Sequence, residues 1–426
     1  MEKELKSIRY QSRTYARVQT VMHMVNETTL KEEHRKQERR KAVGTDGVSK
    51  DEYGRALDRN IADLIVRMKK FSYKPQAVRR TYIPKANGKL RPLGIPSYED
   101  KLVQGTMANI LSDIYEERFC DCSYGFRPER SAHDVVRYIN STIMSKKVGY
   151  VLEADIKGFF DNVNHEWLMK FLEHDIQDPN FLRYVKRFLI AGVMEGTERK
   201  ESDKGTPQGG LISPVLANVY LHYVLDLWYE KVLKEWLKGE VYYVRYADDF
   251  VLMFQYESEA VEVLQRLKER LAKFGLEVAE DKTRILPIGR YKGTTESFDF
   301  LGFTFYNTKN LSGKYRIGVR TSEKKLTAKR QAVKAWLRER LTKPVSETMK
   351  AINISLQGHG NYYGVNGNFS KIRNFWLYVK ETCYRMLNRR DQKGKLKYDK
   401  FQRIWSYYVK EPRLTTDIWN LKPKLA

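Results

Sequence analysis

The sequence has 426 residues and a formal net charge of +25 at pH 7, from 78 Lys and Arg against 53 Asp and Glu. No apolar stretch approaches the ~18–20 residues that cross a bilayer. The N-terminus has early acids and no apolar core, which argues against a secretory signal or a transit peptide. Cys120, Cys122 and Cys383 make neither a disulfide framework nor a zinc motif. We therefore expect ordinary thiols in a reducing cytoplasm.

The positive charge is concentrated at the C-terminal end. From Tyr315 onward there are 26 Lys and Arg against 8 Asp and Glu, a net +18, so the first 314 residues carry only +7. Tyr, Phe and Trp alternate with these cations, which is typical of a protein that binds a phosphate backbone. A solvated surface would mix both signs more evenly, and a membrane-binding surface would call for a strongly amphipathic basic helix, which does not stand out.

In chain order, residues 1–40 are charged, and the run 31–41 predicts an exposed helix or a flexible arm. Residues 42–140 mix helices, such as 58–70, with a hairpin over 81–95. The Asn-Gly pair at 87–88 is typical of a two-residue hairpin turn. This hairpin carries two basic residues, Lys85 and Arg91, which would ordinarily be solvated.

Two apolar, β-favouring segments then end in carboxylates. Val151–Asp155 delivers Asp155 before a turn at Gly158, and Val241–Phe254 is interrupted by Asp248 and Asp249. Adjacent carboxylates above apolar walls are costly unless a cation neutralises them. Two divalent metals, roughly 3.5–4 Å apart, would do so and would serve phosphoryl transfer. The alternative for each aspartate is a solvated turn residue.

The intervening and following segments supply loops and helices. Gly205–Asn218 is a glycine- and proline-rich loop that leads into a helix near Ser213. Helices are predicted around 167–188 and 259–274, and a helical pattern returns after a turn at 311–313. Its apolar stripe, bordered by Lys334 and Arg338, is typical of a helix bundle. The stripe consists of Leu326, Val333, Leu337 and Leu341.

Taken together and in this order, three segments resemble the palm motifs of reverse transcriptases, and in particular those of bacterial group II intron-encoded reverse transcriptase/maturase proteins. They are Asp155–Asp161, Pro207–Pro214 and Tyr246–Asp249. The resemblance extends from about residue 40 to about 415. Further similar segments are Lys41–Gly47, Tyr73–Pro75, Ile83–Pro96, Ser123–Pro128, Phe300–Phe303 and Gly358–Tyr363. The first and last of these are the more specific to the group II lineage.

The resemblance implies an α+β right-hand polymerase fold, with an antiparallel palm sheet flanked by helices and an α-helical thumb. The implied divisions are an N-terminal helical extension (1–40), fingers (41–149), palm (150–310), thumb or maturase domain (311–395) and a short basic C-terminal tail (396–426). Many group II proteins end in an HNH endonuclease with paired Cys and His. The tail from Tyr398 has neither residue type, so we expect no such domain.

The resemblance also implies roles for individual residues. Asp155, Asp248 and Asp249 would be the catalytic carboxylates, and with the carbonyl of Ile156 they would bind two Mg²⁺ ions, for which Mn²⁺ could substitute. The residues expected to bind the dNTP are Lys85, Arg91, Phe160 (as a gate against a 2′-hydroxyl), Gln208, Gly209 and Lys282. Those expected to bind template or primer are Leu301, Gly302, Lys334, Arg338, Tyr362 and Tyr363. His359 is expected to be structural or to contact RNA rather than to be catalytic.

The implied function is that of an RNA-directed DNA polymerase, a nucleotidyltransferase that adds dNTPs to a primer and also binds its intron RNA to assist splicing and mobility. The expected partners are an RNA template, a DNA primer, dNTPs and intron RNA, with no membrane, in a bacterial cytoplasm. Alternatives are a reverse transcriptase recruited to defence, repair or spacer acquisition, and a splicing factor that needs no polymerase. An RNA-dependent RNA polymerase is disfavoured by Phe160. The sequence does not define fidelity, processivity, primer preference, the RNA served, or whether the protein is a monomer or a homodimer.

Overall fold

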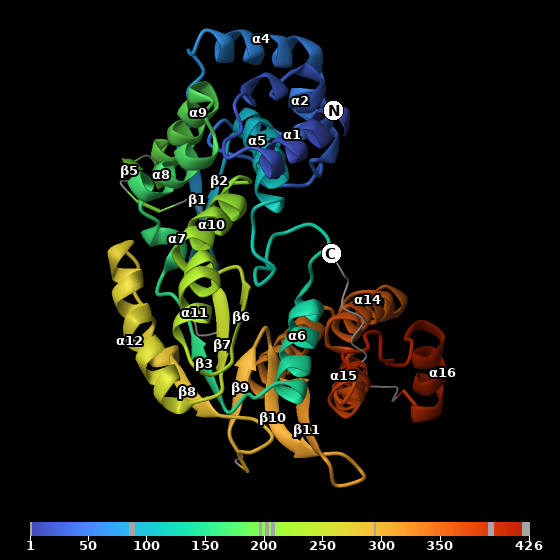
Figure 1. The fold of residues 1–426 in the computed structure, drawn as a ribbon. Helices are drawn as coiled ribbons and strands as arrows, with labels where there is room; N and C mark the ends of the chain where they lie inside the picture. Colours follow the sequence, from blue (N-terminus) through green and yellow to red (C-terminus); the bar gives the residue numbers. More distant parts are fainter. Residues whose placement is uncertain are drawn as a thin grey trace.

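The structure is a computed structural model, and it combines β-sheets with surrounding helices, the α+β class that the sequence predicts (Figure 1). In its described part the strands form three sheets. No helix within that part is long and apolar enough to cross a membrane. The structure describes residues 2–84, 90–195, 198–200, 204–205, 209–293, 295–390 and 396–419.

The N-terminal part is helical and packs around α5, which is buried along most of its length. The charged run at 31–41 begins inside α2, which a capping box at Asn26 starts and whose Leu30 is fully buried. Residues 31–36 are therefore part of a packed helix and not of a flexible arm, whereas residues 38–41 lie beyond its end and are exposed. The helices are α1 (Glu2–Thr14), α2 (Glu27–Lys36), α3 (Lys50–Gly54), α4 (Leu57–Lys69), α5 (Tyr98–Glu116) and α6 (Ala132–Ser145).

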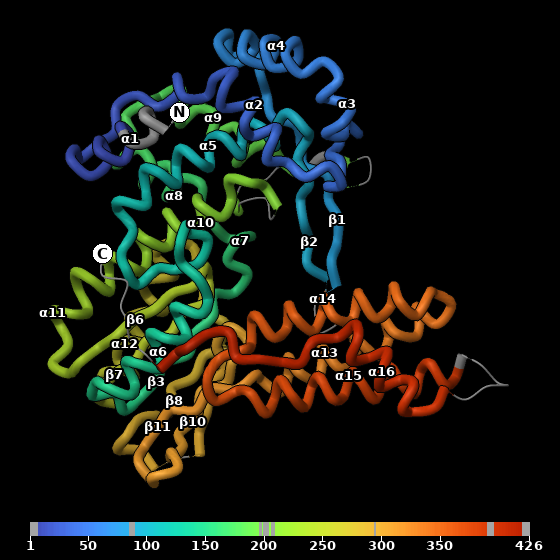
Figure 2. Tube along the Cα trace, turned by 90° about the vertical axis from the view of Figure 1, so that its right-hand side faces the viewer, coloured from blue at the N-terminus to red at the C-terminus, as the bar shows by residue number. Residues whose placement is uncertain are grey.

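A small sheet of strand order β2-β1-β4-β5 lies beside these helices. Its first two strands, β1 (Val78–Pro84) and β2 (Leu90–Ile95), form the predicted antiparallel hairpin, which extends away from the N-terminal helices (Figure 2). The predicted Asn-Gly turn and Lys85 lie outside the described residues. The other two strands are β4 (Val193–Glu195) and β5 (Glu198–Lys200).

The central sheet has the strand order β6-β7-β3-β8 and is antiparallel throughout. Alternate residues of its strands enter different cores. On β3, Leu152 packs into the core shared with the N-terminal helices, whereas Val151 packs into a second core with α6 and the last sheet. Burial of both faces explains why apolar residues occupy successive positions in these strands, as at Val151 and Leu152, and do not alternate strictly with polar ones. The strands are β3 (Tyr150–Ala154), β6 (Val241–Tyr246), β7 (Asp249–Phe254) and β8 (Arg284–Pro287).

The helices that lie between these strands in the sequence cover the face of the central sheet to which Leu152 belongs. Helix α10 starts at the predicted position, with Pro214 in its first turn, and continues into two π-helical segments, His222–Asp226 and Tyr229–Leu233. The helices are α7 (Phe159–Asn162), α8 (His165–Asp175), α9 (Pro179–Ile190), α10 (Ser213–Leu221), α11 (Lys234–Trp236) and α12 (Glu257–Lys273).

The C-terminal part joins a three-stranded antiparallel sheet to four helices. The predicted stripe is present: Leu326, Val333 and Leu337 on α13 are buried, and Leu341 is half-buried just beyond that helix. The elements are β9 (Ser297–Phe300), β10 (Phe303–Lys309), β11 (Tyr315–Thr321), α13 (Glu323–Glu339), α14 (Val345–Tyr363), α15 (Phe369–Arg390) and α16 (Tyr398–Tyr408).

The segment expected as a short basic tail from residue 396 contains a packed helix instead. Phe401 and Trp405 of α16 are almost completely buried in the same core as α13, α14 and α15. The expectation overlooked that these aromatic residues, four positions apart, share one helix face. The helical C-terminal unit thus extends at least to Val409, which is also buried in this core.

Candidate active site

The three predicted carboxylates meet at one edge of the central sheet. Asp155 directly follows β3, and Asp248 and Asp249 lie at the turn between β6 and β7. Because β3 and β7 are antiparallel and Ala154 pairs with Phe250, the end of β3 lies beside the start of β7. The pairing of Tyr246 with Asp249 closes a two-residue turn. Residues 93 positions apart in the sequence are therefore brought together by strand pairing.

Burial and neighbouring negative charge raise the pKa of two of these carboxyl groups, Asp248 and Asp249. Burial, and then the charge of Asp155, raises the pKa of Asp248. Burial, followed by the charges of Asp248 and Asp155, raises the pKa of Asp249 to about 6. The side chain of Asp249 nonetheless keeps part of its surface exposed to solvent. Mutual repulsion of this kind favours a nearby cation.

Cationic side chains from three separate elements face these carboxylates. Lys282, in a short turn before β8, forms an ion pair with Asp155, and this bond raises the pKa of the lysine. The charge of Arg91 on β2 acts to lower the pKa of Asp248, and that of Lys325 on α13 acts to lower the pKa of Asp249. Two predicted residues, Arg91 and Lys282, thus lie within electrostatic reach of the carboxylates. Lys85 is outside the described residues.

The site opens into a cavity of about 550 Å³ between the sheet and the C-terminal helices. Four of the predicted template or primer residues line it. Tyr362 donates a hydrogen bond of 2.9 Å to the carbonyl oxygen of Leu301, which supports a turn in which Leu301 and Gly302 have φ of 49° and 79°. These four are Leu301, Gly302, Tyr362 and Tyr363. Lys334 and Arg338 are exposed on α13 and are not part of this lining.

Phe160 lies on α7 and Gly209 in the loop before α10. Phe160 is half-buried on α7 and packs edge-on against buried Phe159, with ring centroids 5.2 Å apart. Gly209 has φ of 114°, and a Cβ there would lie 2.5 Å from the carbonyl oxygen of Gly94 on β2. This loop therefore touches the hairpin that carries Arg91, and only glycine fits. Gln208 is outside the described residues.

The residue types at this edge suit a hard divalent cation, because carboxylate and carbonyl oxygens are the ligands that Mg²⁺ prefers. In the part of the chain that the structure describes, however, no group of three or more His, Cys, Asp and Glu side chains is placed to hold a metal ion. Lys282 pairs with Asp155. Metal binding would therefore require Asp155 to exchange this lysine for the cation.

Sequence reasoning missed two lysines, Lys324 and Lys325, which also line the cavity. They lie in the first turn of α13, where Ser322 accepts a hydrogen bond from the backbone N–H of Lys325. A Ser followed by Glu-Lys-Lys directly after a strand is a recognisable helix start. That signal could have placed Lys325 at the junction of the last sheet and the helices.

His359 and Cys120 lie outside the carboxylate site, and each has a shifted pKa. His359 is buried between the rings of Tyr363 and Phe375, and burial lowers its pKa to about 4, so a neutral, structural histidine is favoured. Cys120 lies beside a histidine that the sequence does not place near it: Nδ1 of His222 is 3.9 Å from its sulfur. Hydrogen bonding with Cys122, and then with His222, lowers the pKa of Cys120 to about 6. The three cysteines are free.

A known protein family matches the part of the chain that carries this site. The family described as "Reverse transcriptase (RNA-dependent DNA polymerase)" matches residues 83–305, just over half of the chain, and this range contains all three carboxylates. The chain belongs to the reverse transcriptase family. The matched range runs from the hairpin through the central sheet to β10.

Relatives of this reverse transcriptase family member include proteins of group II introns. The chain is 29% identical to the group II intron-encoded protein LtrA of Lactococcus lactis subsp. cremoris, over 82% of this chain and 70% of that protein. It is 33% identical to protein YkfC of Escherichia coli K12, over 64% of this chain and 78% of that protein. It is 26% identical to nuclear intron maturase 2 of Arabidopsis thaliana, over 33% of this chain.

The raised pKa of Asp249 leads to a pH-dependent stability. Because the folded-state pKa, about 6, lies above that of an unfolded Asp, the folded state favours the protonated form. The stabilisation by the proton is complete below the unfolded pKa and is lost as the pH rises through about 6. Asp249→Asn should therefore raise the Tm of the metal-free protein at pH 8, with a gain that disappears near pH 4. Solvent exposure keeps this gain modest.

Thermal unfolding in a chelator between pH 4 and pH 8 measures this difference. Glu269→Gln, which neutralises a carboxylate on α12 away from the site, is the control and should show no such trend. A gain for Asp249→Asn that does not change with pH would contradict the assignment.

Proposed function

We propose that the protein is an RNA-directed DNA polymerase that adds deoxynucleotides to the 3′ end of a primer. The observation that carries this proposal is the group of three carboxylates at one sheet edge, within electrostatic reach of cations from the hairpin, the turn before β8 and α13. Asp155 and Asp249 open into a cavity of about 550 Å³ that Lys282 and Lys325 also line. Phosphoryl transfer needs positioning and charge neutralisation more than covalent participation by the protein, and this arrangement supplies both.

Asp155 and Asp248, with the Ile156 carbonyl and Asp249, would hold the divalent ions that the family uses, for which we propose two Mg²⁺. When bound, the metal ions activate the primer 3′-oxygen and neutralise the triphosphate. Mn²⁺ accepts the same oxygen donors. The closeness of the carboxylates supports such a site, because a bound cation would lower the electrostatic cost of holding their negative charges together.

The remaining side chains orient the substrates. Arg91, with Lys85, would hold the triphosphate, and Lys282, released from Asp155, could turn its charge toward the same phosphates. Gly209 and Gln208 would lie under the incoming nucleotide. Phe160 would pack where a 2′-hydroxyl would otherwise fit and so favour deoxynucleotides. The turn at Leu301 and Gly302, held by Tyr362, would support the primer end.

The C-terminal helices would hold the template–primer duplex and intron RNA. Lys334 and Arg338 lie on the exposed face of α13, in the part of the chain with most of the excess positive charge. Relatives named as a group II intron-encoded protein and as an intron maturase support intron RNA as the partner. We propose fingers (41–149), palm (150–310) and a thumb from 311 that includes α16. A bacterial cytoplasmic location agrees with the free thiols.

A splicing factor without required polymerase activity is the second candidate, because some relatives are named as maturases. Three carboxylates gathered at one sheet edge, where burial and then neighbouring negative charge raise the pKa of Asp248 and Asp249, have no evident use in RNA binding, since carboxylates repel phosphates. This arrangement favours the polymerase. A reverse transcriptase recruited to a host role, such as defence, repair or spacer acquisition, would have the same site, so the site does not separate these two roles.

Primer extension on an RNA template with a DNA primer, Mg²⁺ and dNTPs tests the proposal. The wild type should extend the primer, and Asp248→Ala/Asp249→Ala should lose about 10³-fold or more, because it removes the charge that holds the metal ions. Glu262→Ala/Glu269→Ala removes two carboxylates from the solvent face of α12 and should retain extension. Tight RNA binding without extension by the wild type would instead favour the splicing factor.

Phe160→Ala tests the assignment of the nucleotide gate. Removing the half-buried ring should open space for a 2′-hydroxyl, so the ratio of kcat/KM for dNTP to that for the matching rNTP should fall by 10-fold or more, about 1.4 kcal/mol. Single-nucleotide incorporation with each substrate measures it. Tyr291→Ala removes an 80% exposed ring remote from the carboxylates and should leave the ratio unchanged. Unchanged selectivity in Phe160→Ala would refute the gate.

A further inference from the structure

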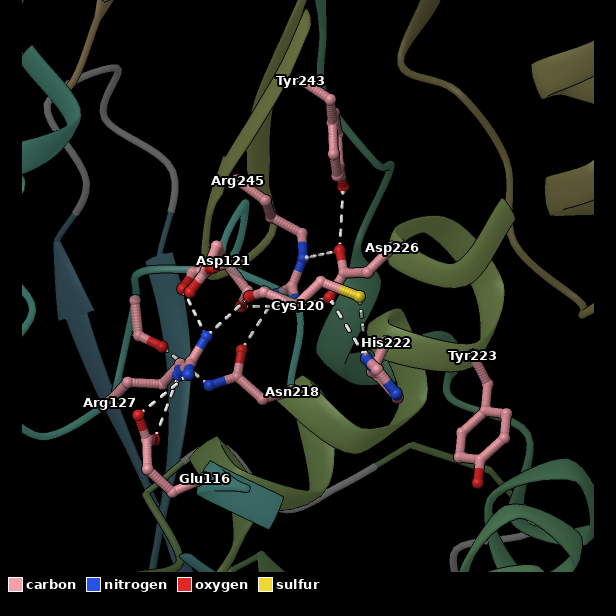
Figure 3. Close-up of polar contacts among 12 residues, drawn as sticks. Glu116, Cys120, Asp121, Arg127, Asn218, His222, Tyr223, Asp226, Tyr243 and Arg245 are labelled. Carbon is pink, nitrogen blue, oxygen red and sulfur yellow. Dashed lines mark hydrogen bonds and ion pairs between the residues drawn. The ribbon is translucent and has the colours of Figure 1, made fainter. Parts of the chain in front are cut away.

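Arg245, three residues before Asp248, is fully buried and uses every N–H of its guanidinium. It is near the end of β6, and its side chain is 0% exposed. A guanidinium has five N–H donors, and here each finds an acceptor. Figure 3 shows Arg245 with two of the residues that accept, Asp226 and Asn218. The acceptors are Asp226 Oδ1 (2.8 Å from Nε), Asp226 Oδ2 (2.5 Å from Nη2), Ser123 Oγ (2.8 Å from Nη2), Asn218 Oδ1 (2.9 Å from Nη1) and the carbonyl oxygen of Ala247 (2.9 Å from Nη1).

The charge of Arg245 is balanced by a single carboxylate on another element. Asp226 ends the π-helical segment that follows α10, is 0% exposed, and also accepts a hydrogen bond of 3.2 Å from Tyr243. A buried ion pair contributes little net stability, because desolvation offsets the attraction. The fixed, forked geometry of the guanidinium is its more distinctive property. This ion pair is therefore better suited to holding a neighbouring group in position than to stabilising the fold.

The guanidinium of Arg245 holds the turn that carries Asp248 and Asp249. Ala247 has φ of 57°, a left-handed conformation that costs an L-residue about 1–2 kcal/mol. The bond from Arg245 Nη1 to the Ala247 carbonyl oxygen holds that peptide in place. The next two residues are Asp248 and Asp249, so a rotation at Ala247 would displace both carboxylates.

The loop Ser123–Pro128, which the proposed function leaves without a role, closes the other side of the turn. A Cβ at Gly125 would lie 2.3 Å from the backbone nitrogen of Ala247, so the two backbones are in direct contact. Asn218 joins both, because it donates 2.7 Å to the Gly125 carbonyl oxygen and accepts from Arg245. The backbone of Arg245 also bonds to this loop, at Cys122 and Tyr124.

A second buried guanidinium holds that loop. Arg127, whose side chain is 2% exposed, donates to the carbonyl oxygens of Cys120 and Ser123, each at 2.8 Å, and pairs with Glu116 of α5. Two forked side chains in series thus connect α5 to the loop and the loop to the catalytic turn.

We propose that Arg245 is a positioning residue that fixes Asp248 and Asp249 for metal binding, with Gly125 as the backbone surface against which their turn is pressed. This inference rests on the proposed function for its kinetic effect but not for its effect on metal affinity. Arg245 acts through the turn and does not touch the substrates.

Arg245→Lys keeps the charge opposite Asp226 but loses the fork. The expected result is a fall in kcat of about 100-fold, the cost of misplacing reacting groups by about 1 Å, and a higher Mg²⁺ concentration for half-maximal rate. The KM for dNTP and the Kd for template–primer should be unchanged. Arg118→Lys is the matched control, because Arg118, which is half-buried, pairs at 2.7 Å with the buried carboxylate of Asp175 and does not contact the turn. It should lower the Tm without changing the Mg²⁺ dependence.

Mn²⁺ binding to the free protein, followed by electron paramagnetic resonance, separates this inference from the proposed function. If the wild type binds Mn²⁺ but does not extend primers, the proposed function is wrong, but the inference about Arg245 is not affected. Arg245→Lys should weaken Mn²⁺ binding about 10-fold, whereas Arg118→Lys should not. Wild-type Mn²⁺ affinity and Mg²⁺ dependence in Arg245→Lys would overturn the inference, as would a wild type that binds no Mn²⁺.

If Arg245→Lys does not fold, Gly125→Ala decides. Its Cβ displaces the turn without removing a charge, so Mn²⁺ affinity should again fall. Gly293→Ala is its control, because a Cβ there meets nothing within 4 Å. Equal Mn²⁺ affinity in the two alanine variants would overturn the inference.

Discussion

The burial of carboxylates at one sheet edge, with the charge of Asp155 close to Asp248 and Asp249, is the constraint on which the rest of the structure depends. The antiparallel pairing of β3 with β7 forces Asp155 toward Asp248 and Asp249, and burial of both sheet faces prevents the strands from moving apart. The raised pKa values of Asp248 and Asp249 record the cost of this arrangement. A site held in this state by its scaffold is prepared for cations and for the phosphates that accompany them.

The other parts of the molecule supply charge and shape to this edge. Arg91 comes from the hairpin, Lys282 from the turn before β8, and Lys325 from the first turn of α13. Each lies on an element that packs independently, so the balance of charge depends on how the elements are placed. The cavity of about 550 Å³ between the central sheet and the C-terminal helices is where, in the proposed function, a primer end and a nucleotide would meet.

The sequence predicted the features that depend on local patterns. Val, Tyr and Phe around Asp248 indicated strands, and the apolar spacing from Leu326 to Leu337 indicated a helix that packs on one face. The family membership followed from motifs in the right order. The placement of Arg245 could not be predicted, because its partner Asp226 lies 19 residues earlier, in a π-helical segment, and the two meet only in the folded chain. Contact between Cys120 and His222, separated by 102 residues, likewise exists only in the folded chain.

The central claim is that the carboxylate edge binds two divalent cations in place of the lysine. Anomalous diffraction from Mn²⁺ in crystals of the protein with a chain-terminated template–primer and an incoming dNTP tests it most directly. The account predicts two anomalous peaks between Asp155 and Asp248, roughly 3.5–4 Å apart, with Lys282 released from Asp155. Anomalous density absent from this edge, with the Lys282–Asp155 pair intact beside a bound dNTP, would contradict it.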